Sequence, residues 1–144
     1  MCCHMAYRLI PVSLSLATDV THQCWVHRTR DEHLIGVIKF SKPASEFTWG
    51  DVEYCRRRIE EFSLMPFPEC VNAMVIDIQD FQAFIDNDAV LTPWRLQEEE
   101  CPIRLIVPTA LIEVYSGIFE PTWLSTSVDS AIQEIRDFMD MFVH

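Results

Sequence analysis

Residues 73–78 have the sequence AMVIDI, a short apolar run that decides the fold of this chain. The run is too short for a buried helix and is typical of a central strand that is covered on both faces. A second run of this kind, IRLIV, occupies residues 103–107. We therefore expect two buried strands at the centre of a mostly parallel sheet.

Two long amphipathic helices accompany these strands. The first begins after Thr48, a favourable N-cap with Asp51 three places on, and ends before Pro66. The second begins after Ser127, and its apolar stripe consists of Ala131, Ile132, Ile135, Phe138, Met139 and Phe142. The first helix has a similar stripe, so both helices are predicted to pack one face against the sheet; this stripe consists of Trp49, Val52, Cys55, Ile59 and Phe62.

Shorter elements fill the remaining chain. Residues 92–100 form a predicted helix, because a capping Thr precedes a first-turn Pro. Thr109 is expected to cap a short helix that stops at Gly117, and residues 123–125 have room for a short edge strand. Residues 86–91 form an extra turn or a loop.

The N-terminal region predicts antiparallel pairing. Residues 7–16 alternate partly and predict a strand, and residues 22–28 and 34–40 flank a polar turn at residues 30–32. The predicted fold class is therefore α/β, with a mixed sheet. An N-terminal antiparallel strand and hairpin precede alternating helices and mostly parallel strands.

Composition predicts one soluble domain over residues 1–144, with a flexible tail at residues 1–6. The chain is 49% hydrophobic, and its 22 acidic against 11 basic side chains give a net charge of -11. That field repels nucleic acid and anionic membranes, so we expect neither as a partner. Six scattered cysteines are typical of a reduced, cytoplasmic protein, and three dispersed glycines build no phosphate loop.

His22 and Cys24 are the sharpest metal-ligand candidates. Side chains two apart in a strand share a face, whereas His27 would point to the other face. A polar hairpin face is the favoured interpretation. We expect no metal or other cofactor.

Carboxylates cluster after the central strand: Asp77, Asp80, Asp86 and Asp88. Open α/β sheets place ligands at this end of their strands, where such carboxylates can bind Mg²⁺ or accept phosphate. No lysine follows Lys42 to pair with an acyl-phosphate. Turn-forming and helix-capping roles are favoured.

The order and spacing of these segments resemble the STAS family, the domain of bacterial anti-sigma-factor antagonists and sulfate-transporter tails. The resemblance covers about residues 34 to 140 and is still closer to STAS-like, lipid-carrier-related bacterial proteins. It is carried by residues 34–40 (LIGVIKF), 73–81 (AMVIDIQDF), 84–86 (FID), 103–108 (IRLIVP) and 127–132 (SVDSAI).

In the antagonists, the corresponding strand leads to a turn whose Ser or Thr is phosphorylated to release the partner. Here Asn87 takes that position and Ala89 the approximate position of a glycine, so the resemblance implies no phosphorylation switch. The partner face implied by the resemblance, with Trp94 as an aromatic anchor, comprises Asp80, Asp86, Asn87, Asp88 and Trp94.

Three functions follow as hypotheses. The first is a non-enzymatic, STAS-like regulatory domain that binds a protein. The alternative is a binder of a small apolar ligand or lipid in a pocket between sheet and helices. A phosphatase or hydrolase that uses the aspartates comes third. Dimerisation through the unpaired edge of the hairpin is a further expectation.

Overall fold

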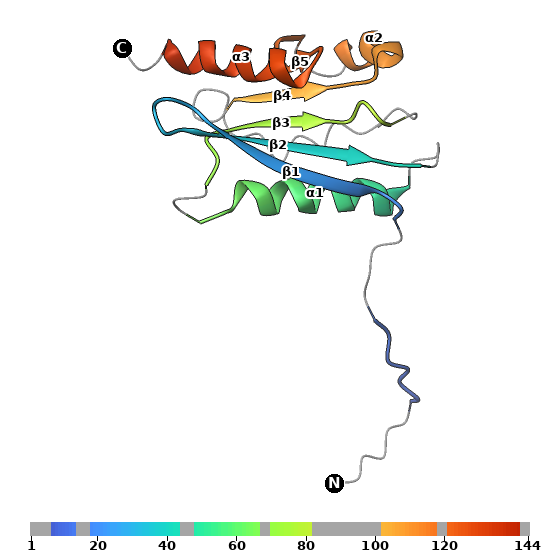
Figure 1. Cartoon of the computed structure of the whole chain (residues 1–144). Helices are drawn as coiled ribbons and strands as arrows, with labels where there is room; N and C mark the ends of the chain where they lie inside the picture. The colour runs from blue at the N-terminus through green and yellow to red at the C-terminus, as the bar shows by residue number, and fades with distance from the viewer. Residues whose placement is uncertain are drawn as a thin grey trace.

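The computed structural model describes residues 7–13, 18–43, 48–66, 70–81, 102–117 and 121–141. Five strands form one sheet in the order β1-β2-β3-β4-β5 (Figure 1). They are β1 (Thr21–Arg28), β2 (Leu34–Ser41), β3 (Ala73–Asp77), β4 (Ile103–Ile106) and β5 (Leu124–Ser125). Only β1 is antiparallel to its neighbour, and the other strand pairs are parallel. The predicted α/β class with a mixed sheet is confirmed.

Helices cover both faces of the sheet. They are α1 (Trp49–Ser63), α2 (Ile112–Ser116) and α3 (Val128–Asp140), with 3₁₀ turns at Thr109–Leu111 and Pro121–Trp123. Figure 1 shows α1 on one side of the sheet and α3 on the other. Every residue of β3 and β4 is buried, as expected for central strands.

Both long helices begin where their caps predict. The hydroxyl of Thr48 accepts a hydrogen bond from the Asp51 amide at 3.2 Å, and the Asp51 carboxylate accepts one from the Thr48 amide at 2.9 Å. At α3, the Ser127 hydroxyl accepts from the Ser130 amide at 3.1 Å. These bonds satisfy amides that lack partners inside the helix.

Strand alternation divides the apolar interior into two clusters. The larger one packs against α1 and α2, and its buried members are Val20, Ile38, Phe40, Cys55, Ile59, Met74, Ile76, Ile78, Phe81, Ile103, Leu105, Val107 and Tyr115. The smaller one packs under α3 and contains Ile35, Val37, Ala73, Val75, Ile106, Ala131 and Ile135. The two faces of one sheet therefore have interiors of unequal size.

A buried ion-pair cluster fixes the start of α1 to the end of β2. The Lys42 ammonium lies 2.8 Å from a carboxylate oxygen of Asp51 and 2.5 Å from one of Asp19. The Thr18 hydroxyl donates to the other Asp51 oxygen at 2.7 Å. Asp51 is only 1% exposed, so its charge depends on these partners.

Two predicted features of the chain were wrong. Residues 7–13 form no strand, and their apolar side chains Tyr7, Leu9, Ile10 and Val12 are exposed. Partial alternation is a weak signal, and Pro11 has no amide to donate to a ladder. Thr109 does not cap α2, because Pro108 precedes a 3₁₀ turn and α2 begins only at Ile112.

Several predicted features lie outside the described residues: the tail at 1–6, residues 14–16 of the first strand, the turn or loop at 86–91 and the helix at 92–100. The edge strand is confirmed, although it contains only Leu124 and Ser125 because Trp123 belongs to a 3₁₀ turn. Gly117 ends α2 as predicted.

Candidate functional site

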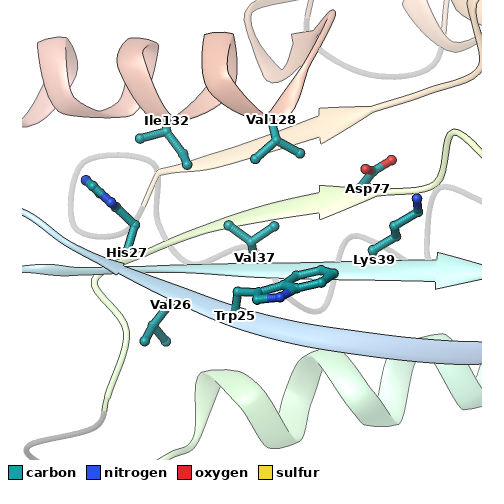
Figure 2. Close-up of a pocket in the computed structure, with 8 residues that line it drawn as sticks. All are labelled: Trp25, Val26, His27, Val37, Lys39, Asp77, Val128 and Ile132. Carbon is teal, nitrogen blue, oxygen red and sulfur yellow. The ribbon is translucent and has the colours of Figure 1, made fainter.

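A cleft opens between the sheet and α3 (Figure 2). It encloses about 380 Å³. Its lining comes from three strands and one helix: Trp25, Val26 and His27 of β1, Val37 and Lys39 of β2, Asp77 of β3, and Val128 and Ile132 of α3. Apolar side chains predominate, and two charged groups lie at one end.

In the part of the chain that the structure describes, one helix lies on this face of the sheet, and one helix cannot cover five strands. A helix is about 10 Å wide and neighbouring strands lie about 4.8 Å apart, so one helix covers two or three strands. Helix α3 packs on β3, β4 and β5. Glu134 reinforces this position, because it accepts a hydrogen bond from the Ser125 hydroxyl and lies 3.7 Å from Arg104 Nε.

Strand β1 is therefore left open on this face. Trp25 pairs with Val37 in the antiparallel register, so both side chains point toward the α3 side. Trp25 remains 49% exposed, whereas Val37 is buried at 5%. The side chain of Val26 points to the opposite face, so this residue lines the cleft from the edge of β1 (Figure 2).

The polar end of the cleft lies at the carboxyl ends of β2 and β3. Lys39 and Asp77 are partners in the parallel register and lie side by side (Figure 2). Asp77 is buried, and its carboxylate accepts a hydrogen bond from the Gln79 amide at 3.0 Å. A donor and an acceptor thus meet beside an apolar surface, at the sheet edge where open α/β folds bind ligands.

Asp80 lies at the rim of this polar end. Its carboxylate accepts a hydrogen bond from the Ser41 hydroxyl at 2.9 Å and lies 3.5 Å from the Lys39 ammonium. The structure therefore brings one predicted site residue next to the cleft. The other four, Asp86, Asn87, Asp88 and Trp94, lie outside the described residues.

His22 and Cys24 share the α1 face of β1, whereas His27 points to the α3 face, as strand alternation predicts. His22 Nδ1 lies 2.5 Å from the Tyr54 hydroxyl. Burial first, and then the charge of Glu61, raise the pKa of the Cys24 thiol, which disfavours the thiolate that a metal requires. Among the residues described here, no three metal-ligating side chains come together.

Sequence reasoning missed Trp25, Lys39 and His27 as site residues. For Trp25 and His27, the sequence contained one signal: positions 25 and 27 alternate with 24 and 26 along a predicted strand. That pattern shows which side chains share a face, but not which face a helix leaves uncovered. Asp77 was named only as a member of the carboxylate cluster after the central strand, for which turn-forming and helix-capping roles were favoured.

The fold and the cleft define this protein as an α/β domain with an open, largely apolar cleft beside its edge hairpin. Comparison of the chain with protein-family models, curated proteins and solved structures finds no match. The STAS-like resemblance therefore stays a prediction. No helix in the described part of the chain is long and apolar enough to cross a membrane.

Proposed function

We propose that this protein binds a small amphipathic molecule in the cleft between β1, β2, β3 and α3. The observation that carries the proposal is an apolar cleft of about 380 Å³ with Lys39 and Asp77 together at one end. Ligand sites typically measure about 300–1,000 Å³ and combine apolar walls with a few convergent polar groups. The ligand's apolar body would lie on Trp25 and Ile132.

The polar end favours an uncharged head group with both a donor and an acceptor, such as an amide or an alcohol. Lys39 offers a donor and Asp77 an acceptor, and Asp80 already balances the Lys39 charge at 3.5 Å. A ligand carboxylate would bring a further negative charge toward a protein whose net charge is -11. A neutral head group avoids that repulsion and satisfies both groups.

The regulatory, protein-binding function implied by the STAS resemblance is a separate hypothesis. Its turn at residues 86–89 lies outside the described residues, and the cleft argument does not depend on it. Pocket binding is favoured because the described cleft supplies a surface, a volume and polar groups for it.

Binding of decanamide, followed by tryptophan fluorescence and calorimetry, tests the proposal. Trp25→Ala should weaken binding at least about tenfold, roughly 1.4 kcal/mol, because it removes the aromatic wall. Trp49→Ala is the matched control, since Trp49 is 76% exposed at the start of α1 on the opposite side of the sheet. Trp49→Ala should unfold within about 0.5 kcal/mol of the parent, whereas Trp25→Ala should cost about 1 kcal/mol because half of Trp25 is buried.

A second comparison tests the head group. Lys39→Met should reduce the preference for decanamide over decane, because it removes the donor and keeps the apolar stem. The proposal fails if no amide or alcohol of this length binds, or if Trp25→Ala and Trp49→Ala bind decanamide equally well.

A further inference from the structure

β1 occupies the outer position of the sheet and exposes an unusually long edge. It has eight residues, of which seven are exposed and one is intermediate. Among the described residues, its single neighbour in the sheet is β2. An edge strand presents a row of backbone donors and acceptors to whatever approaches it.

The turn beside β1 shows which backbone groups point outward. The Thr29 amide donates to the His33 carbonyl at 2.8 Å, so these two residues form a hydrogen-bonded pair. Hydrogen-bonded pairs recur at every second residue along an antiparallel ladder. Residues 21, 23, 25 and 27 therefore bond to β2. His22, Cys24, Val26 and Arg28 direct their amides and carbonyls away from the sheet.

Apart from Arg28 at its end, the side chains of β1 include none of the features that protect an edge strand from pairing. Its sequence, THQCWVHR, contains no Asp, Glu, Lys or Pro, although the chain as a whole carries a charge of -11. Natural edge strands are commonly protected by lysine, proline, inward charges or short length. An acidic protein approaches a second copy of itself with least repulsion along a segment that has no carboxylates.

We propose that two copies of this chain pair through β1, antiparallel and about a two-fold axis perpendicular to the sheet. The outward groups at even positions allow a register in which Trp25 faces Trp25 of the second copy. Cys24 then faces Val26 of the second copy, and Val26 faces its Cys24. These cross-strand pairs are apolar on both faces of the joined sheet, which is the pairing that stabilises antiparallel strands.

The pairing also completes the cleft described above. β1 forms the open side of that cleft, and Trp25 lies at its rim with 49% exposure. A two-fold axis perpendicular to the sheet keeps both α3 helices on the same face, so the two clefts lie side by side. The second copy's strand then extends the floor of each cleft. The dimer itself rests on the edge of β1 and needs no ligand.

The mass of the full chain in solution, measured without ligand by sedimentation equilibrium, tests the pairing. The parent should populate a species of twice 16.8 kDa at high micromolar concentration. Val26→Pro removes an amide that only the second copy would use, so it should weaken dimerisation at least tenfold. Val26→Ala is the matched control and keeps the amide. Val26→Lys serves the same test if the proline variant does not fold.

Cross-linking tests the register. In a Cys24→Ser background, Trp25→Cys should form a covalent dimer on mild oxidation. The two residues at position 25 would form a non-hydrogen-bonded antiparallel pair, whose Cα atoms lie about 4.5 Å apart, within reach of a disulfide. Gln23→Cys in the same background should not, since Gln23 would face His27 of the second copy. A monomeric parent at all concentrations overturns the proposal, and so does a dimer that neither Val26→Pro nor Val26→Lys weakens. Cross-linking at position 23 instead of 25 overturns the register. Decanamide binding is measured separately, so failure of the dimer and failure of the cleft are distinguishable.

Discussion

The two faces of the sheet use the same strands to different ends. On one face, α1 and α2 bury a large cluster that includes Phe40, Ile59 and Tyr115, each fully buried. On the other face, α3 is the one described helix; it covers a smaller cluster and leaves β1 open. The comparison shows that an apolar cleft can arise where helix coverage is incomplete, without any special motif.

The contrast is visible within a single strand. In β2, Ile38 and Phe40 point into the large cluster, whereas Val37 and Lys39 point toward the cleft. One of the chain's two lysines therefore reaches the open face, and the other, Lys42, is buried in the ion-pair cluster at the start of α1. The closed face contains the larger apolar core, whereas the open face presents Lys39 and Asp77 to the cleft.

The largest expected effect is a difference in unfolding free energy between substitutions on the two faces of the sheet. Ile59→Ala should lower the free energy of unfolding by about 3–4 kcal/mol, because Ile59 is fully buried on α1 and its loss leaves a cavity. Ile132→Ala, at the cleft wall, should cost only about 1 kcal/mol, since Ile132 is partly exposed. Urea unfolding measures both. Equal losses would contradict the division into a closed and an open face.

The ion-pair cluster of Lys42, Asp19 and Asp51 beside α1 should make the free energy of unfolding depend on pH. Burial alone would raise the pKa of Asp51, but bonds from Lys42, Thr48 and Thr18 outweigh it and hold the pKa below its ordinary value of 3.8. The resulting stabilisation is complete above pH 3.8 and is lost as the pH falls through the lower, folded-state pKa. Asp51→Asn should therefore cost about 2 kcal/mol at neutral pH.

The difference between the parent and Asp51→Asn should shrink as the pH falls below 3.8, which thermal unfolding at several pH values would follow. Asp129→Asn is the control, because Asp129 is exposed in the first turn of α3. If the stability difference between the parent and Asp51→Asn stays constant as the pH falls below 3.8, the ionised Asp51 carboxylate is not its source.

The smallest expected effect concerns how closely α1 approaches β2. A Cβ at Gly36 would lie 3.0 Å from side-chain atoms of both Phe62 and Val71, so Gly36→Ala should cost about 1 kcal/mol. At Gly117 the nearest atom is 3.5 Å away, and Gly117→Ala should be neutral or stabilise by about 0.5 kcal/mol. Equal melting temperatures for the two variants would show that Phe62 and Val71 shift to accommodate the added methyl group without a loss of stability.

Much of the fold was predictable because it depends on local patterns. The buried runs of β3 and β4, the hairpin, and the caps at Thr48 and Ser127 all follow from residues near one another in the chain. Two predictions that rested on weaker local patterns were wrong. Residues 7–13 form no strand despite their alternation, and Thr109 loses its capping role to the 3₁₀ turn that follows Pro108.

The candidate site was less accessible from sequence. Asp80 was predicted through its position after the central strand, and the structure places it 3.5 Å from Lys39 at the rim of the cleft. Trp25 and Lys39 themselves carry no recognisable motif. Their importance depends on the register between β1 and β2, and on where α3 lies across the sheet.

By itself, the sequence determined an acidic α/β domain with a mixed sheet and an edge hairpin, because periodicity and capping are local properties. The tertiary structure alone decided that Trp25, Lys39 and Asp77 share one cleft. These residues come from three different strands, and they share the cleft because α3 lies over β3, β4 and β5. Which strands a helix leaves uncovered is set by packing between distant segments, which no local pattern specifies.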